Sequence, residues 1–251
     1  MITDDALQQG RLQSLMVFEE TGMINGTSNS DFGNMSLVYG DTAGALVNRQ
    51  HFLKKLNIDY RNLVTAEQVH GSRVAQVVVS DRGKGALSYN TALAGVDALL
   101  TKDRNLPLAI FSADCLPIFL YDREIPAIGL VHAGWRGTKE NIVAKAIDLM
   151  KKEFKSKPQD LIAGFGPSIR ECCYEVDGEF QKHFTYGLIE RKGSYFLDLA
   201  GINRKQLVSS GVKERNIFDP GICTFCRKSD FFSFRRQGIS CGRMISVIML
   251  R

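Results

Sequence analysis

The chain has 251 residues, of which 44% are hydrophobic and 24% charged, and its 32 basic and 27 acidic residues give a formal net charge of +5. This composition predicts a folded globular protein and excludes a disordered chain. The positive excess is small and forms no long basic run, so it suits an anionic small molecule at least as well as a nucleic acid, and we expect no nucleic-acid partner.

No segment approaches the roughly 18 consecutive apolar residues needed to span a membrane, and residues 1–5 lack the basic-then-apolar order of a signal peptide. We therefore expect a cytoplasmic protein without a membrane partner. Its six cysteines are then reduced thiols, metal ligands or packed side chains, not disulfides. No repeat or linker divides the chain, so residues 1–251 are expected to form a single domain, whose oligomeric state the sequence leaves unknown.

The first forty residues contain turn-forming pairs and little periodicity. A helix is predicted over 43–56, because its apolar residues form a partial stripe. Short runs rich in β-branched and large apolar residues then predict strands, since glycine, proline and aspartate separate them. These strands cover 63–69, 73–79, 97–101, 108–112, 118–121 and 127–132.

The clearest helix is predicted over 138–154, with Thr138 as its N-cap and Glu140 in its first turn. Apolar residues at 142, 146, 149 and 150 share one helical face. The remaining predictions are a strand over 161–165, a helix near 178–185, a strand over 195–199, a helix near 200–210 and a strand over 243–250. Runs of strands with occasional helices predict an α+β fold, with mixed β-sheets flanked by helices.

Two of the four histidines lie where functional side chains are often found. His51 and His183 have charged neighbours and are expected at the surface. His70 and His132, in contrast, each end a predicted strand, and a glycine follows within two residues. Tight turns at strand ends are common positions for binding and catalytic residues.

Cys115 also follows a predicted strand, and Pro117 fixes the turn after it. Two neutral imidazoles and one thiolate suit zinc, and a fourth position left open is the arrangement of a catalytic site. The separations along the chain match no local metal motif, however. On spacing alone, a buried cysteine beside two hydrogen-bonded histidines is the simpler interpretation.

Three sequence blocks resemble the signatures of the YfiH family, also called the laccase-domain or polyphenol-oxidase-like proteins. They are EQVHG at 67–71, ADCLP at 113–117 and GLVHAGWRGT at 129–138, of which the last is the most specific. The resemblance continues at 164–169, 172–176, 230–236 and 242–243, and so covers about residues 15–251. One departure concerns residues 26–31, GTSNSD, which lack the arginine that many members carry near the N-terminus, and this affects the expected substrate range.

The resemblance implies a YfiH-like α+β domain with zinc held by His70, Cys115 and His132. It also implies phosphorolysis of adenosine, inosine and methylthioadenosine, together with adenosine deamination. Purine nucleosides and phosphate are then the partners. A copper-dependent oxidation of phenols, claimed for some members, is the alternative function. Only four histidines are present, which argues against a multicopper cluster, so copper is the weaker choice of metal.

Two further functions use the same residues. A non-enzymatic zinc-stabilised binding module is one, although an open three-ligand site argues against it. The other is a hydrolase with Cys115 as a nucleophile activated by histidine, without a metal. Metal analysis of the purified protein distinguishes the hydrolase from a zinc enzyme.

Asp114 adjoins Cys115, and three roles are open for it: proton transfer in the site, support of a metal-bound histidine, or a turn cap. We include it among the candidate catalytic residues, with His70, Cys115 and His132.

Four residues are candidates for binding substrate. Arg136 is the foremost, because its fork of donors suits phosphate, with an ion pair before the next helix as the alternative. Arg243 and Arg49 are similar candidates. Gln68, on the same strand face as His70, either contacts substrate or packs within the sheet.

The remaining cysteines carry weaker signals. Cys223 and Cys226 could form half of a zinc site, for which Cys241 and His183 are the available partners, or a redox pair. A Pro-Gly pair before them predicts a turn where a redox motif would start a helix. The family resemblance implies that Cys223 packs near the site, and we expect Cys226 to be incidental. The adjacent cysteines at 172–173 are too close for an ordinary disulfide, and we expect at least one to be packed.

Overall fold

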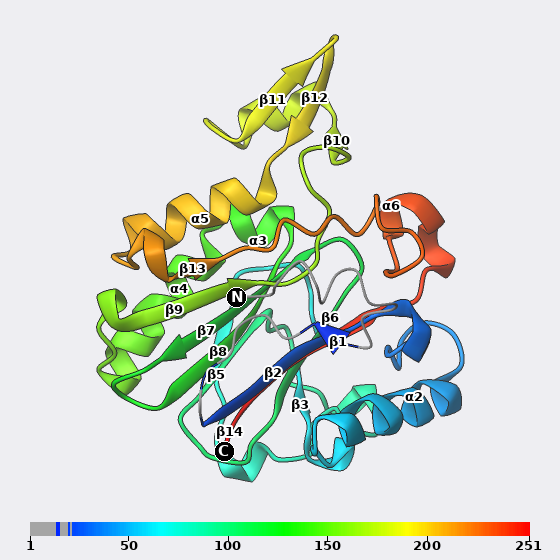
Figure 1. Ribbon diagram of the computed structural model, residues 1–251, viewed down its shortest axis with the longest axis vertical. Helices are drawn as coiled ribbons and strands as arrows, with labels where there is room; N and C mark the ends of the chain where they lie inside the picture. Colours follow the sequence, from blue (N-terminus) through cyan, green and yellow to red (C-terminus); the bar gives the residue numbers. More distant parts are fainter. Residues whose placement is uncertain (1–13, 16–19, 21) are drawn as a thin grey trace.

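The computed structural model describes residues 14–15, 20 and 22–251. The parts of the predicted domain and of the family resemblance that fall on residues 1–13, 16–19 and 21 lie outside the described residues. Figure 1 shows two large β-sheets, helices beside them and a small sheet that projects from the body.

The first large sheet has six strands in the order β13-β9-β7-β8-β5-β4. It is mixed, because β13 pairs with β9 and β4 with β5 in parallel, whereas the other neighbours are antiparallel. Its strands are β4 (Val74–Gln76), β5 (Ala98–Thr101), β7 (Leu116–Asp122), β8 (Ala127–Ala133), β9 (Leu161–Phe165) and β13 (Ile217–Phe218).

The second large sheet has the order β1-β2-β14-β6-β3, with only β3 and β6 in parallel. Its strands are β1 (Ser14–Leu15), β2 (Met23–Ser28), β3 (Val64–Thr65), β6 (Leu108–Ser112) and β14 (Met244–Leu250). The small sheet has the order β10-β12-β11, formed by β10 (Glu175–Val176), β11 (Leu188–Arg191) and β12 (Ser194–Leu197).

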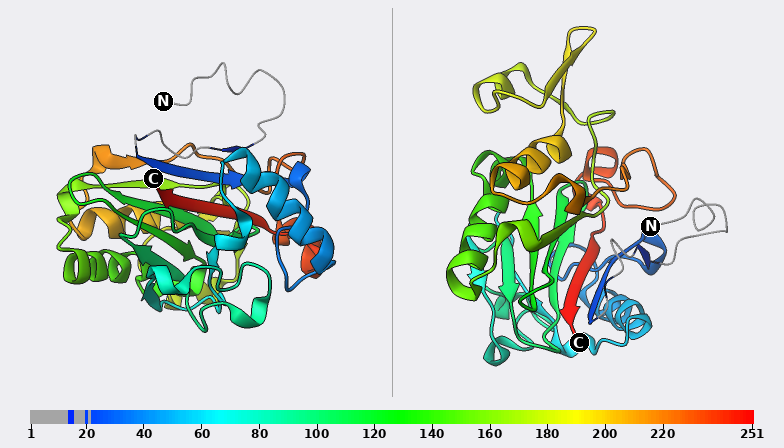
Figure 2. Two further views of the ribbon diagram at one scale, coloured as in Figure 1. Left: turned by 90° about the horizontal axis from the view of Figure 1, so that it is seen from below. Right: turned by 60° about the vertical axis from the view of Figure 1, so that its left-hand side comes forward.

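Helices cover the outer faces of the two large sheets (Figure 2). The α-helices are α2 (Thr42–Lys55), α3 (Trp135–Lys139), α4 (Ile142–Leu149), α5 (Leu199–Ser209) and α6 (Phe234–Gln237). Helices α4 and α5 pack on the six-stranded sheet, and α2 packs on the five-stranded sheet. Short 3-10 helices lie at Ser30–Phe32, Tyr60–Asn62, Val79–Asp81, Tyr89–Thr91, Pro158–Asp160, Gly178–Lys182, Glu214–Asn216 and Gly238–Ser240.

Alternation along the central strands explains this layering. In β14, Ile248 and Leu250 face the six-stranded sheet, while Val247 and Met249 face the layer of α2. Successive strand side chains point to opposite faces. A strand buried on both faces therefore has a nearly continuous apolar run, such as MISVIML, in which Ser246 is the single polar residue. The predicted α+β fold with mixed sheets flanked by helices is confirmed.

The predicted helix over 138–154 is wrong in detail. Helix α3 starts at Trp135, Asn141 takes a left-handed conformation (φ 58°), and α4 then begins at Ile142, followed by a π-helical turn over Met150–Phe154. Thr138 is not an N-cap. It is buried within α3, and its Oγ1 accepts a hydrogen bond from Nδ2 of Asn203 on α5 (2.9 Å). This tertiary bond helps to fix α3 as a separate element.

Other boundaries also differ from the sequence prediction. Strands β6 and β9 have the predicted limits, whereas the strands predicted over 63–69 and 73–79 shorten to β3 and β4. The helix predicted near 178–185 is a 3-10 turn. Strand β2 was missed because MINGTS is mostly polar or small, yet it lies between β1 and β14 and is buried along its length.

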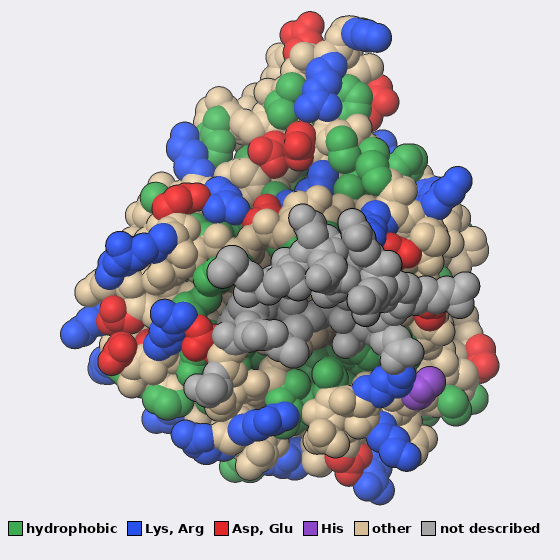
Figure 3. Space-filling model, in the orientation of Figure 1, with side chains coloured by type: hydrophobic (Ala, Val, Ile, Leu, Met, Phe, Trp, Pro, Cys, Tyr) green, Lys and Arg blue, Asp and Glu red, His purple; other side chains and the backbone are tan. Residues whose placement is uncertain are grey.

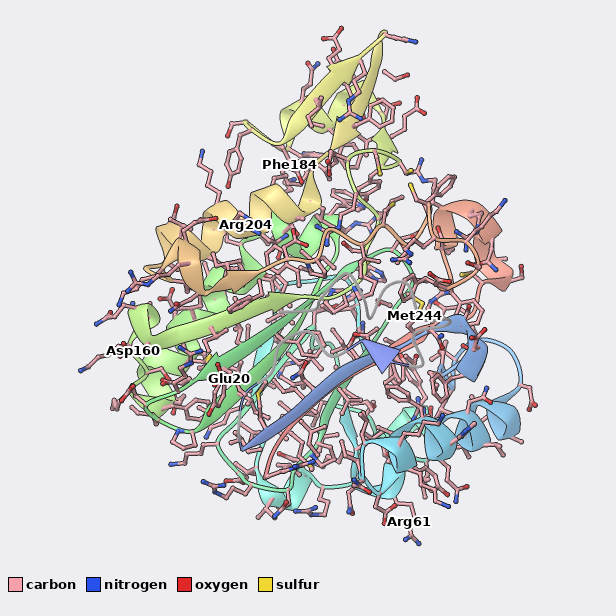
Figure 4. All side chains as sticks on the ribbon, viewed as in Figure 1. Glu20, Arg61, Asp160, Phe184, Arg204 and Met244 are labelled. Carbon is pink, nitrogen blue, oxygen red and sulfur yellow. The ribbon has the colours of Figure 1, made fainter. Side chains whose placement is uncertain are left out.

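Phe184 connects the projecting sheet with the main body. Figure 4 shows Phe184 below that sheet, beside α5, and its ring belongs to the core cluster of the helical layer.

The face seen in Figure 3 intersperses Lys and Arg with Asp and Glu, and its described residues show no continuous basic stripe. Within the described part of the chain, every helix is too short or too polar to cross a bilayer.

Candidate metal centre and substrate cavity

A cavity of about 650 Å³ opens where strands of both large sheets end. Strand β6 ends at Ser112, β7 begins at Leu116, and β8 ends at Ala133, which pairs with Leu116. This volume is within the roughly 300–1,000 Å³ that is usual for small-molecule sites. All eight residues predicted from sequence line the cavity: Arg49, Gln68, His70, Asp114, Cys115, His132, Arg136 and Arg243.

The structure brings together the three predicted metal ligands. His70, Cys115 and His132 place one ligand atom each within 4.8 Å of one another, and the two imidazole rings meet edge to face at 4.9 Å. In a tetrahedral zinc site, bond lengths of about 2.0–2.3 Å set ligand atoms roughly 3.3–3.8 Å apart. The donor set therefore fits a single zinc ion after a small adjustment, with one coordination position left for substrate.

Asp97, just before β5, organises this centre, and the sequence reasoning missed it. Its Oδ1 lies 2.8 Å from Nδ1 of His132, and both side chains are buried. The same carboxylate accepts backbone N–H bonds from Val69, His70 and Gly71, at 3.2, 3.0 and 2.8 Å. Asp97 therefore holds the turn that carries His70. By bonding Nδ1 of His132, it leaves Nε2 of that imidazole available to a metal.

Charge coupling within the centre favours a thiolate. Burial alone disfavours the charged form of Cys115, but the charge of His132 and hydrogen bonds from both histidines outweigh it and lower the pKa of the thiol to about 6. Burial likewise disfavours protonated His132, whereas the Cys115 thiolate and Asp97 raise the pKa of the imidazole to about 9. A cation on the neutral imidazoles would replace the imidazolium as the charge that stabilises the thiolate.

Two glycines allow the close packing around the ligands. A Cβ at Gly134 would lie 3.2 Å from Sγ of Cys115 and 3.3 Å from Cδ2 of His70. A Cβ at Gly137 would lie only 2.6 Å from the backbone oxygen of Gly71. The HAGWRG block therefore supplies a ligand and also two positions without a side chain next to the ligand turn.

Asp114 anchors the C-terminal loops. Its carboxylate accepts hydrogen bonds from Oγ1 of Thr224 (2.6 Å), Oγ of Ser233 (3.0 Å) and the backbone N–H of Arg235 (2.7 Å). The suggested support of a metal-bound histidine belongs to Asp97 instead. Asp114 sits at φ 92° in the turn before β7, so the strand alternation used to predict its direction does not apply there.

Gln68 and Arg49 line the cavity but bind the backbone. The amide of Gln68 donates to the carbonyl oxygen of Phe111 and accepts from its N–H, both at 2.7 Å, which matches the packing alternative. The guanidinium of Arg49 is buried and donates to the carbonyl oxygens of Met35, Gly85 and Ala86. Burial lowers the pKa of Arg49 to about 9, which keeps it charged at neutral pH. Its bonds hold the cavity wall, and its role as a substrate ligand stays a prediction.

Three other arginines present charge to the cavity. Arg136 stacks on Trp135 at 4.7 Å, and Arg243 stacks on Tyr39 at 4.4 Å. Arg235, which was not among the candidates named from sequence, lies 5.5 Å from the ring of Tyr174. Within the described part of the chain, none of the three forms an ion pair with a carboxylate, so the predicted alternative of an ion pair at Arg136 is not seen.

Tyr174 is a second residue that the sequence reasoning missed. Burial, together with the nearby Cys115 thiolate, raises the pKa of its phenol well above the usual range. The hydroxyl therefore keeps its proton and is a hydrogen-bond donor on the cavity wall. Residues 172–176 belong to the family resemblance, but only the fold brings this tyrosine to the cavity of the candidate metal ligands.

The other histidines and cysteines lie outside this centre. His51 is exposed, as expected, whereas His183 is half-buried and stacks on Trp135 with ring centroids 5.8 Å apart. Neither His183 nor Cys241 joins Cys223 and Cys226. The neighbours of that pair are the adjacent cysteines at 172–173, so Cys226 lies among three other thiols.

Comparison with known proteins places this geometry in a family. Residues 18–251 match the model of a family described as "Multi-copper polyphenol oxidoreductase laccase". The chain belongs to this family, as the sequence blocks had indicated.

Individual relatives agree with this assignment. The chain is 35% identical over 237 residues to the purine nucleoside phosphorylase YlmD of Bacillus subtilis (strain 168), covering 90% of this chain and 85% of the relative. It is 33% identical over 237 residues to the adenosine deaminase RL5 of an unknown prokaryotic organism, covering 90% of each. The crystal structure of YlmD from Geobacillus stearothermophilus superposes with a TM-score of 0.92 at 33% identity, over 97% of this chain and 98% of that one.

Proposed function

We propose that the chain is a zinc-dependent purine nucleoside enzyme, which cleaves adenosine, inosine and methylthioadenosine by phosphorolysis and also deaminates adenosine. One observation carries this proposal: a single cavity combines three metal-ligand residues with three arginines that lack carboxylate partners and with several aromatic rings. The names of the relatives, purine nucleoside phosphorylase and adenosine deaminase, support the same class of reaction.

His70, Cys115 and His132 would hold the zinc ion. Bound there, zinc supplies a Lewis acid with an open coordination position. Asp97 contributes by fixing the orientation of His132 and the turn of His70, so the ligands are set before substrate enters.

Phosphorolysis requires an anion to be held beside C1′ of the nucleoside. A phosphate oxygen forms the new bond to C1′ while the bond to the purine nitrogen breaks, and the leaving purine takes the bonding electrons and a proton. The guanidinium groups of Arg136, Arg235 and Arg243 suit the phosphate, because charge-assisted forked donors bind its oxygens in a defined orientation. The protonated hydroxyl of Tyr174 suits the leaving base as a hydrogen-bond donor.

Deamination uses the same cavity differently. Water adds to C6 of adenosine and ammonia leaves, so the reaction needs neither phosphate nor the arginine cluster. Inosine has no exocyclic amine and cannot be deaminated. The three arginines without carboxylate partners, which deamination would not need, therefore favour phosphorolysis as the main activity.

Copper-dependent oxidation of phenols is the second candidate, because the family description names it. The chain has four histidines, of which only His70 and His132 line the cavity. Multicopper chemistry requires more imidazole ligands than these two supply, which favours zinc over copper here.

The test is a product assay on the zinc-loaded protein. We expect hypoxanthine from inosine only when phosphate is present, and adenine as the main product from adenosine. Equal turnover of adenosine with and without phosphate, giving inosine alone, would replace the phosphorylase with a deaminase. Inertness toward every purine nucleoside, with phenol oxidation after addition of copper, would favour the oxidase.

Arg136→Ala tests the phosphate site itself. Loss of a charge-assisted pair worth about 1.5–3 kcal/mol should raise KM for phosphate about 10–160-fold and leave KM for the nucleoside nearly unchanged. Arg61→Ala is the matched control, because Arg61 is exposed, pairs with Asp59 and does not line the cavity. Equal increases in both KM values would place Arg136 outside the phosphate site.

A further inference from the structure

A second group of cysteines lies outside the cavity. Sγ atoms of Cys172, Cys173, Cys223 and Cys226 all lie within 4.8 Å of one another. Cys226 is 3.3 Å from Cys173 and 3.7 Å from Cys172, sulfur to sulfur. Neither phosphorolysis nor deamination uses these thiols, so their convergence needs a separate explanation.

We propose that these four cysteines, termed the thiol cluster below, bind a second zinc ion as a structural site. Four thiolates around zinc at about 2.3 Å lie roughly 3.8 Å apart, close to the sulfur separations seen here. A tetrathiolate set fills all four positions of the ion, in contrast to the three-ligand centre of the cavity. Binding displaces thiol protons and involves no oxidant.

The backbone around Cys223 suits a metal-bound thiolate. The N–H groups of Phe225, Cys226 and Arg170 point at its sulfur, and its carbonyl oxygen accepts the N–H of Arg227 at 3.0 Å. This tight turn brings the sulfurs of Cys223 and Cys226 to one side. N–H donors directed at a ligand sulfur are the surroundings that stabilise a thiolate on a metal.

The position of the thiol cluster explains what such an ion would stabilise. Residues 166–174 and 219–233 contain no helix or long strand, yet they run side by side (Figure 1). Thr224 donates its N–H to the carbonyl oxygen of Ser168 at 3.0 Å, and Arg170 pairs with Asp219 at 2.7 Å. An ion on cysteines more than 50 positions apart along the chain would restrict both segments, since it closes a long loop.

The first segment forms part of the cavity wall through Ile169 and Tyr174, and the second is bonded to Asp114, which also lines the cavity. Cys173 directly precedes Tyr174, and Cys223 directly precedes Thr224, whose hydroxyl donates to Asp114. The structural ion would therefore hold the phenol of Tyr174 and the anchor of Asp114 in place without contacting substrate. The proposal does not depend on which reaction the cavity performs.

Metal content is the first test. Wild-type protein produced with added zinc and desalted should hold two zinc ions per chain, whereas Cys223→Ser/Cys226→Ser and Cys115→Ser should each hold one. Cys241→Ser is the control, since Cys241 is buried outside the thiol cluster, and it should keep two. One zinc ion in the wild type, retained in the Cys223→Ser/Cys226→Ser variant, would overturn the proposal.

Two measurements guard against variants that fail to fold. Wild-type protein is unfolded in denaturant with a chelator present and without reductant, and its free thiols are alkylated. All six cysteines should be modified. Modification of only four would show a disulfide and refute the zinc site. Cobalt added to metal-free Cys115→Ser should give the strong visible absorption and thiolate charge-transfer band of tetrahedral tetrathiolate cobalt. Absence of these bands from the folded variant would also contradict the proposal.

Discussion

Asp97→Asn should weaken both the fold and the metal centre. In the wild type, Oδ2 accepts N–H bonds from Val69 and Gly71, while Oδ1 accepts from the N–H of His70 and faces Nδ1 of His132. An asparagine amide offers one acceptor oxygen, so either orientation leaves two of these donors without a partner.

The size of the effect follows from those contacts. A buried donor left unsatisfied costs about 1–3 kcal/mol, so the free energy of unfolding of the metal-free protein should fall by about 2–6 kcal/mol. Loss of the partner that orients a metal-bound histidine typically lowers metal affinity by about 10–100-fold, or about 1.4–2.7 kcal/mol. The two losses are separable because the first needs no metal.

Urea unfolding of metal-free protein measures the first loss, and competition for zinc with a chromogenic chelator measures the second. Asp103→Asn is the control, because Asp103 is not buried and accepts one N–H, from Val79 at 2.7 Å. If Asp97→Asn unfolds at the wild-type urea concentration and binds zinc with wild-type affinity, then Asp97 does not organise the centre and the reasoning fails.

Two further changes test the ligands directly. Cys115→Ser should lose the zinc of the cavity and the activity together in metal analysis and product assay, because a serine hydroxyl does not replace the thiolate; full zinc content with lost turnover would instead indicate a cysteine nucleophile. Gly134→Ala should weaken zinc binding about tenfold in the competition assay, since its methyl group would approach Cys115 and His70 to 3.2–3.3 Å. Gly178→Ala, whose methyl group would meet only the ring of Tyr195 at 3.5 Å, should bind zinc as the wild type does, and equal weakening in both would show that steric crowding is not the cause.

Local patterns were sufficient for much of the fold. Strands β6 and β9 have the predicted limits because each is a short apolar run bounded by turn-forming residues. Strand β2 could not be predicted in this way, because its pairing with β14 buries a segment that has a polar composition. The helix over 138–154 was predicted from its apolar repeat, but a left-handed Asn141 interrupts it.

The same division holds for the site. The resemblance of three sequence blocks to a known family pointed to His70, Cys115 and His132, and the structure brings these three side chains together. Asp97 has no such signal in its neighbourhood, since its role depends on a bond to a histidine 35 positions later.

The sequence by itself therefore determined which residues are suited to a metal and which segments are apolar enough to form the layers. Only the tertiary structure decided what supports the ligands, which arginines lack carboxylate partners, and that four cysteines converge. The reason is physical: turns and most apolar strands follow from neighbours along the chain. The pairing that buries β2, and hydrogen bonds between residues such as Asp114 and Thr224, 110 positions apart, form only when the layers pack.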